Sequence, residues 1–244
     1  MPVLEIRPDW DNLAHYENDK TTHGSSQTDA GCSLADAEAN VRRSLRAVGP
    51  IPEGERYGAE WRAVEKWCEE AGLILSARVK PEREGGREHD LSRLADGRLW
   101  LKFTKPWSSG YAVDLSGREP ILLPARPLQY LARLRLQNRF FGDAIRFVGI
   151  THDAKSRRIV ISQPDIRGRP GTWDEIDHWF VEHGFAKLKV QRLGAYDSAA
   201  FGGHGVGVFD VRPINVVMTD EGMLLPIDVM MRPLTKLQLK RLMA

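Results

Sequence analysis

The sequence predicts an α+β fold in which an antiparallel sheet is combined with several capped helices. Helical periodicity prevails in the segments before Gly72, and short apolar runs with period-two alternation follow it. Polar, glycine-containing turns separate those runs, as they do between the strands of hairpins. Helix start signals then recur between the strand segments. Together these patterns favour a sheet whose strands are interrupted by helices.

Composition is that of an ordinary globular chain. Of 244 residues, 42% are apolar and 28% are charged, and the net charge of +2 gives no argument for nucleic-acid binding by itself. No apolar run reaches the length of a membrane span, and the first residues do not form a signal peptide. We therefore expect a cytoplasmic protein without a membrane partner, in which Cys32 and Cys68 are thiols.

Five helices are predicted, over residues 33–48, 59–71, 126–140, 172–183 and 233–243. Ser33 caps the first and Gly72 ends the second. Thr172 caps the fourth, with Glu175 completing a capping box. Residues 18–31 carry no periodicity, so we expect them to be mobile.

Strands are predicted over residues 73–79, 89–94, 98–103, 144–150 and 158–163. The dipeptide Asp96-Gly97 is a strong hairpin signal between the second and third strands. The polar loop between the first two strands contains Gly85-Gly86, and Lys102 lies on the third strand.

Residues 210–215 read Asp-Val-Arg-Pro-Ile-Asn and are followed by two short apolar runs that predict a hairpin. This hairpin brings Asn215, at its start, beside Asp228, at its end. Phosphoryl transfer needs a carboxylate that orients the attacking hydroxyl and hard oxygen ligands for Mg²⁺. Asp210, Asn215 and Asp228 offer these groups. The alternative is a β-hairpin with polar ends and no chemistry.

This segment resembles the catalytic loop and metal-binding strand of protein kinases, with Arg212 where kinases usually carry Lys. The chain also resembles the kinase-like domain of polyvalent proteins from phages and conjugative elements. The stretches that carry this resemblance are residues 85–89, 128–131, 138–143, 161–164 and 210–228.

The resemblance implies a compact protein-kinase-like two-lobe fold that uses ATP and Mg²⁺. Its parts are an N-terminal helical extension over 1–72, an antiparallel N-lobe over 73–163 and a minimal C-lobe over 164–244. Asp210, Lys102 and Arg212 are then the catalytic residues, and Asn215 and Asp228 are the metal ligands. The nucleotide-binding residues are Lys102, Gly85, Gly86, Glu88, Gln163, Pro164, Asp165 and Ile166, the last four forming the hinge.

Several features depart from the kinase pattern. Val208-Phe209 replaces the His-Arg pair before the catalytic Asp, and Val229-Met230 replaces the Phe-Gly pair after the metal Asp. The helix over 126–140 has no acidic residue to pair with Lys102, so Glu88 is our substitute candidate, with a surface glutamate as the alternative. Only sixteen residues follow Asp228, which leaves no room for an activation segment.

Three functions follow from these patterns. The first is an ATP:Mg-dependent phosphotransferase that acts on a hydroxyl of a protein or small-molecule acceptor. The second is a nucleotide-binding pseudokinase that serves as a binding module of a mobile element. The third is a nucleic-acid-associated module, suggested only by the basic tail with Lys236, Lys240 and Arg241, and nucleic acid is not our expected partner.

Overall fold

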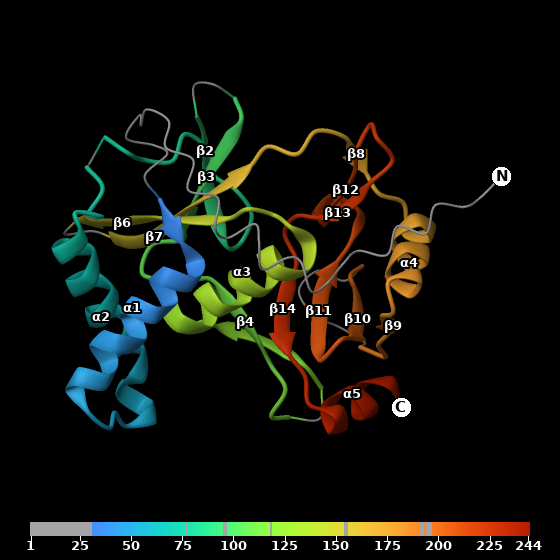
Figure 1. The fold of residues 1–244 in the computed structure, drawn as a ribbon, viewed down its shortest axis with the longest axis horizontal. Coiled ribbons are helices and arrows are strands. Elements are labelled where there is room, and N and C mark those ends of the chain that lie inside the picture. Colours follow the sequence, from blue (N-terminus) through green and yellow to red (C-terminus); the bar gives the residue numbers. More distant parts are fainter. Residues whose placement is uncertain are drawn as a thin grey trace.

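The computed structural model describes residues 31–244 apart from residues 77, 95–96, 118, 154–155, 191–192 and 194–196 (Figure 1). Its larger half is built on a five-stranded antiparallel sheet with the strand order β1-β6-β7-β3-β2. The strands are β1 (Cys32–Ser33), β2 (His89–Arg93), β3 (Leu99–Thr104), β6 (Arg146–Asp153) and β7 (Ser156–Pro164).

Three helices pack against one face of this sheet (Figure 1). They are α1 (Leu34–Val48), α2 (Arg56–Ala71), which follows the 3₁₀ turn Glu53–Glu55, and α3 (Pro127–Phe141). Their core contains the fully buried Trp61, Tyr130 and Phe147. The opposite face of the sheet carries a smaller cluster around Leu101 and Phe103. Because side chains alternate along β3, Lys102 points to the α3 side of the sheet.

The second half contains two small antiparallel sheets (Figure 1). One has the order β14-β11-β10-β9 and the other β13-β12-β8. Their strands are β8 (Arg169–Pro170), β9 (Ala186–Lys187), β10 (Ala199–Gly203), β11 (Val206–Val211), β12 (Val216–Met218), β13 (Leu224–Pro226) and β14 (Met230–Pro233). A 3₁₀ turn, Pro213–Asn215, joins β11 to β12, and the helices are α4 (Trp173–Glu182) and α5 (Lys236–Met243).

Helix α3 joins the two halves. Its buried Leu131 and Leu134 lie in the core of the first half, while Leu136 and Phe140 pack against the core of the second. The hairpin of β4 (Tyr111–Asp114) and β5 (Ile121–Pro124) lies beside it, with Val113 in a third cluster shared with β14 and α5. Among the described residues, no helix has the length and apolar character needed to cross a membrane.

The α+β class is confirmed, as are four of the predicted helices nearly to their ends. Ser33 accepts a hydrogen bond from Asp36 N, Gly72 ends α2 with a φ of 68°, and Thr172 and Glu175 form the capping box. Four of the five predicted strands also exist, as β2, β3, β6 and β7.

The predicted strand over 73–79 is wrong. Only one parallel bridge joins Ile74 to Ile150, because β1 occupies the neighbouring part of the β6 edge. The β2 segment instead meets Glu82 and Arg83, both of which donate to Leu91 O. The helix predicted over 233–243 begins only at Lys236, since β14 continues to Pro233.

The β4–β5 hairpin and the pairing of β10 with β11 are among the elements that were not predicted. The expected mobile segment lies outside the described residues except for Gly31, and so does Asp96 of the hairpin signal. The domain boundaries at 72 and 163 stay predictions, although α1 and α2 share one core with α3 and the sheet.

Candidate active site

A lysine and an aspartate that are far apart in the chain form the centre of the site. Lys102 Nζ lies 3.6 Å from Asp228 Oδ1. The Lys102 side chain is 13% exposed, whereas the Asp228 side chain is 48% exposed. Opposite Lys102 lie Leu91 of β2 and Ile161 of β7, and Ile161 belongs to the core that contains α3. Register therefore places the Lys102 side chain on the α3 face of the sheet, and its ion pair with Asp228 brings the ammonium group beside the second half of the molecule.

The segment that carries Asp228 is held from both sides by its neighbour Ile227. Ile227 N donates to Asn215 O over 2.9 Å, at the open end of the β12–β13 hairpin. Ile227 O accepts from Gln163 Nε2 over 2.7 Å, at the end of β7. Gln163 is buried and lies opposite Trp100, so it shares the Lys102 face of the sheet. The hairpin thus brings the backbone of Asn215 beside the residue that precedes Asp228, and Gln163 links the same segment to the sheet that carries Lys102.

Asp210, the next-to-last residue of β11, has an unusual backbone conformation. Its φ is 55°, in the left-handed region that residues other than glycine rarely adopt. Asn215 Nδ2 donates to Asp210 O over 2.8 Å and to Oδ2 over 3.2 Å, and Arg212 Nε lies 3.8 Å from Oδ1. Such a conformation costs about 1–3 kcal/mol and is concentrated at functional sites. The backbone of Asp210 is therefore strained, and its carboxyl is held by Asn215 and Arg212 of its own motif.

Charge controls the ionisation of Asp228. Enclosure by protein atoms tends to raise the pKa of its carboxyl, but the nearby positive charges of Lys102 and Arg133 outweigh that effect and lower the pKa below its ordinary value. Asp228 is therefore a carboxylate at neutral pH. A carboxylate that is both ionised and half-exposed can still receive a cation from solvent.

Asp143 is a site residue that sequence reasoning did not single out. It follows α3 directly, is 3% exposed, and its Oδ2 accepts from Gln137 Nε2 over 2.5 Å and from Gln163 Nε2 over 2.6 Å. Within the described part of the chain, its Oδ1 has no hydrogen-bond partner. Burial raises the pKa of Asp143 to about 6, against the lowering effects of the Gln163 bond and the charge of Lys102. The signals in the sequence were its place directly after a helix and its membership of the stretch 138–143 that carries the family resemblance.

Glu88 is committed to α3 and not to Lys102, contrary to our expectation. Arg133 Nη1 lies 2.8 Å from Glu88 Oε1, and Arg133 Nη2 donates to Oε2 over 2.9 Å. Tyr111 N also donates to Oε1 over 2.8 Å. The Arg133 and Glu88 side chains are only 4% and 10% exposed. In the kinase pattern the helix supplies a glutamate and the strand a lysine. Here α3 supplies a cation, Arg133, and the residue before β2 supplies an anion, Glu88.

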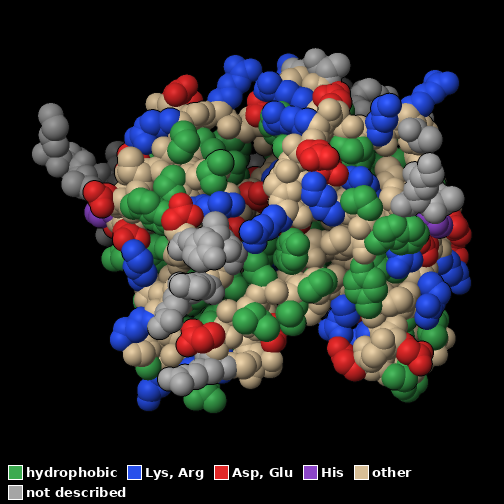
Figure 2. Space-filling model, turned by 180° about the vertical axis from the view of Figure 1, so that it is seen from behind, with side chains coloured by type: hydrophobic (Ala, Val, Ile, Leu, Met, Phe, Trp, Pro, Cys, Tyr) green, Lys and Arg blue, Asp and Glu red, His purple; other side chains and the backbone are tan. Residues whose placement is uncertain are grey.

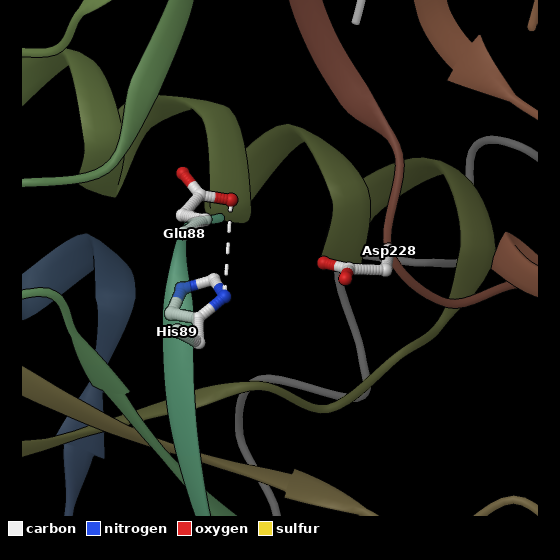
Figure 3. A group of neighbouring side chains, drawn as sticks. All are labelled: Glu88, His89 and Asp228. Atoms are coloured by element: carbon white, nitrogen blue, oxygen red, sulfur yellow. Dashed lines mark ion pairs between the residues drawn. The ribbon is translucent and has the colours of Figure 1, made fainter. Parts of the chain in front are cut away.

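Glu88, His89 and Asp228 offer ligand atoms that lie within 4.8 Å of one another, with Asp228 pointing at the other two (Figure 3). His89 Nε2 lies 2.8 Å from Tyr130 Oη, and burial lowers the pKa of His89, which keeps its ring neutral. Arg133 already neutralises the charge of Glu88, so Glu88 is not a free carboxylate ligand. Glu88 and His89 are instead buried polar neighbours of Asp228. We do not assign a three-ligand metal centre to this group.

The glycine loop turns next to β2. Gly85 N donates to Asp90 Oδ1 over 3.4 Å, and a Cβ at Gly85 would lie 2.2 Å from His89 O, so the chain packs too closely there for a side chain. Gly86 faces open space. The exposed basic residues of this part of the chain include Arg83, Arg87, Arg93 and Arg98. Figure 2 shows blue side chains along the upper edge of the molecule.

The predicted hinge differs from a free backbone edge. Gln163 and Pro164 belong to β7 and pair with β3, and Asp165 N donates to Arg98 O over 2.7 Å. Asp165 Oδ1 accepts from Trp100 Nε1 over 2.7 Å, and Oδ2 pairs with Arg93. The backbone N–H of Asp165 is therefore already used, which leaves the segment around Ile166 as the remaining part of the predicted hinge.

An open hollow of about 660 Å³ follows this connector. It is lined by Gly168, Arg169, Met218, Thr219, Asp220 and Gly222. None of these residues is among those that surround Lys102 and Asp228. The Lys102–Asp228 pair therefore lies outside the hollow.

The donor set suits Mg²⁺ bound beside nucleotide phosphates. Asp228 supplies a carboxylate, and Asn215 uses Nδ2 on Asp210, which turns its Oδ1 away from that residue. Mg²⁺ prefers such hard oxygen ligands, and it usually takes only one or two from the protein and the rest from phosphates and water. No family model matches the chain, and neither does any curated protein or solved structure.

Proposed function

We propose that this chain is an ATP:Mg²⁺-dependent phosphotransferase with a kinase-like division into two lobes. The supporting observation is the approach of Lys102 Nζ to within 3.6 Å of Asp228 Oδ1, with Asn215 bonded to the residue before Asp228. Lys102, Asp228 and Asn215 come from three separate elements, and Asn215 is joined to the Asp228 segment through its backbone oxygen. Phosphoryl transfer depends on such positioned charges more than on covalent chemistry.

In this proposal Lys102 binds the nucleotide phosphates, and Asp228 and Asn215 hold the metal ion. Mg²⁺ would supply neutralisation of the phosphate charge when it is bound. Asp210 orients the acceptor hydroxyl and takes its proton, and Arg212 faces the same carboxyl. The acceptor oxygen forms a bond to the γ-phosphorus while the bond to the β–γ bridging oxygen breaks, and ADP leaves. The acceptor is a protein or a small molecule.

A nucleotide-binding module without transfer is the second candidate. It is favoured by the Arg133–Glu88 pair, which places a cation where an active kinase helix presents its glutamate. On this alternative the site still binds Mg-ATP, but Asp210 has no acceptor to activate.

The test combines binding and turnover in two variants. Asp210→Asn keeps the size of the side chain and is expected to abolish ADP formation while Mg-ATP affinity stays within about threefold of the parent. Asp228→Ala is expected to weaken Mg-ATP binding. ADP formation at parental rates in both variants refutes the phosphotransferase proposal. Mg-ATP binding by the parent without any ADP formation selects the binding module.

A further inference from the structure

We propose that Asp143 is the positioning residue for Lys102, in place of the helix glutamate that this chain lacks. The inference rests on the proposed function. It identifies the group that holds the lysine when Asp228 binds a cation.

The first support is that Asp143 bonds to Gln163, which lies on the same face of the sheet as Lys102. Gln163 Nε2 donates both to Asp143 Oδ2 over 2.6 Å and to Ile227 O over 2.7 Å. One amide group therefore holds Asp143 next to the segment of Asp228. Gln163 also lies diagonally across the β3–β7 ladder from Lys102, which pairs with Ile161 two positions away. Asp143 therefore lies close enough to Lys102 and Asp228 for the charges of both to act on its carboxyl.

The second support is the unused oxygen of Asp143. Its Oδ2 receives both amide donors, whereas Oδ1 has no hydrogen-bond partner in the described part of the chain, although the residue is 3% exposed. A buried carboxylate oxygen without a donor is costly to keep unless a cation faces it. Lys102 and Asp228 are the charged groups that act on it, and only Lys102 favours its ionised form.

The third support is that α3 offers Lys102 no other carboxylate. Glu88 is bonded to Arg133 and Tyr111 N, and α3 itself contains no acidic residue. In the structure Lys102 pairs with Asp228 at 3.6 Å. Once Asp228 is engaged by a cation, Asp143 is the acidic group left to fix the ammonium group.

The test measures Mg-ATP affinity by calorimetry in a double-mutant cycle. Asp143→Asn is nearly isosteric, and its amide oxygen can still accept from Gln137 and Gln163. It is expected to weaken Mg-ATP binding roughly tenfold, the effect of one charge-assisted contact. In a Lys102→Met background the same change is expected to alter affinity by less than about twofold, because the residue acts through the lysine.

Glu60→Gln is the matched control. Glu60 is also buried, burial also raises the pKa of its carboxyl, and it bonds to Leu128 N away from the site. Its change is expected to leave Mg-ATP affinity at the parental value. If Asp143→Asn does not fold, Gln137→Met retains the Asp143 carboxyl with one donor fewer and is expected to weaken binding about threefold.

The outcomes separate the two proposals. A parent that binds no Mg-ATP overturns the proposed function and this inference with it. A parent that binds Mg-ATP, with parental affinity in Asp143→Asn, overturns the inference alone. Equal losses from Asp143→Asn with and without Lys102 also overturn it, because they indicate a purely structural role. If Asp143→Asn does not fold, parental Mg-ATP affinity in Gln137→Met overturns the inference.

Discussion

Removal of Arg133 is expected to destabilise the protein more than removal of any exposed arginine on α3. Arg133 forms two contacts with Glu88, at 2.8 and 2.9 Å, and both side chains are at least nine-tenths buried. Arg133→Met leaves the Glu88 carboxylate buried without its cation. Breaking such a pair costs about 3–5 kcal/mol, which for a chain of this length lowers the melting temperature by about 6–20 °C.

Arg135→Met provides the control on the same helix. Arg135 Nε lies 2.8 Å from Glu38 Oε2, but the Arg135 side chain is 42% exposed, and Arg42 also pairs with Glu38. Loss of a pair that is open to solvent is expected to cost less than about 1 kcal/mol. The two arginines thus differ mainly in burial.

The assay is urea unfolding at pH 7, followed by circular dichroism, for both single variants and for Arg133→Met combined with Glu88→Gln. The double variant removes both charges and is expected to recover at least half of the loss seen in Arg133→Met. The reasoning is refuted if Arg133→Met is no less stable than Arg135→Met, or if the effects of Arg133→Met and Glu88→Gln simply add.

Three further predictions concern the same site. The folded-state pKa of Asp143, about 6, lies above its ordinary value of 3.8, so its burial is destabilising above pH 6 and this cost disappears as the pH falls toward 4. The free energy of unfolding is measured for the parent and for Asp143→Asn at pH 4.5 and at pH 7. The difference between the two proteins should shift in favour of Asp143→Asn by about 1–3 kcal/mol from pH 4.5 to pH 7, and a difference that does not change with pH would count against a raised pKa. Gly110→Ala should cost at least about 2 kcal/mol in urea unfolding, because φ is 75° and a Cβ would lie 2.2 Å from Glu88 Oε1; parental stability would contradict that contact. Asp210→Gly and Asp210→Ala lose the same carboxyl, but only glycine accepts the φ of 55° without strain, so Asp210→Gly should be about 1 kcal/mol more stable than Asp210→Ala while both lose ADP formation; equal stability of the two variants would show that the backbone is not strained.

Local signals accounted for much of the fold. Caps such as Ser33 and Thr172 fixed the helix starts because their side chains bond within three residues of the chain. The β12–β13 hairpin was readable for the same reason, and with it the meeting of Asn215 with the segment of Asp228. Lys102 was placed on its strand by simple alternation.

Distant contacts were not readable. The apolar run after Gly72 has the composition of a strand, but whether it joins the sheet depends on β1, which competes for the β6 edge from more than thirty residues away. Glu88 was expected beside Lys102, yet its partner Arg133 is 45 residues away on α3. The role of Asp143 depends on Gln163, which is twenty residues further along. Burial and charge pairing across such separations are decided by packing and not by local pattern.

Dependence of ATP binding on Mg²⁺ is the most direct test of the proposed function. The measurement is ATP affinity by calorimetry with Mg²⁺ and with EDTA, in the parent and in Asp228→Ala. Because Asp228 is ionised and half-exposed beside Lys102, we expect the parent to bind ATP at least about tenfold more tightly with Mg²⁺, and Asp228→Ala to lose that difference. Absence of ATP binding in the parent, or equal affinity with Mg²⁺ and EDTA, would contradict a Mg-nucleotide site at Lys102 and Asp228.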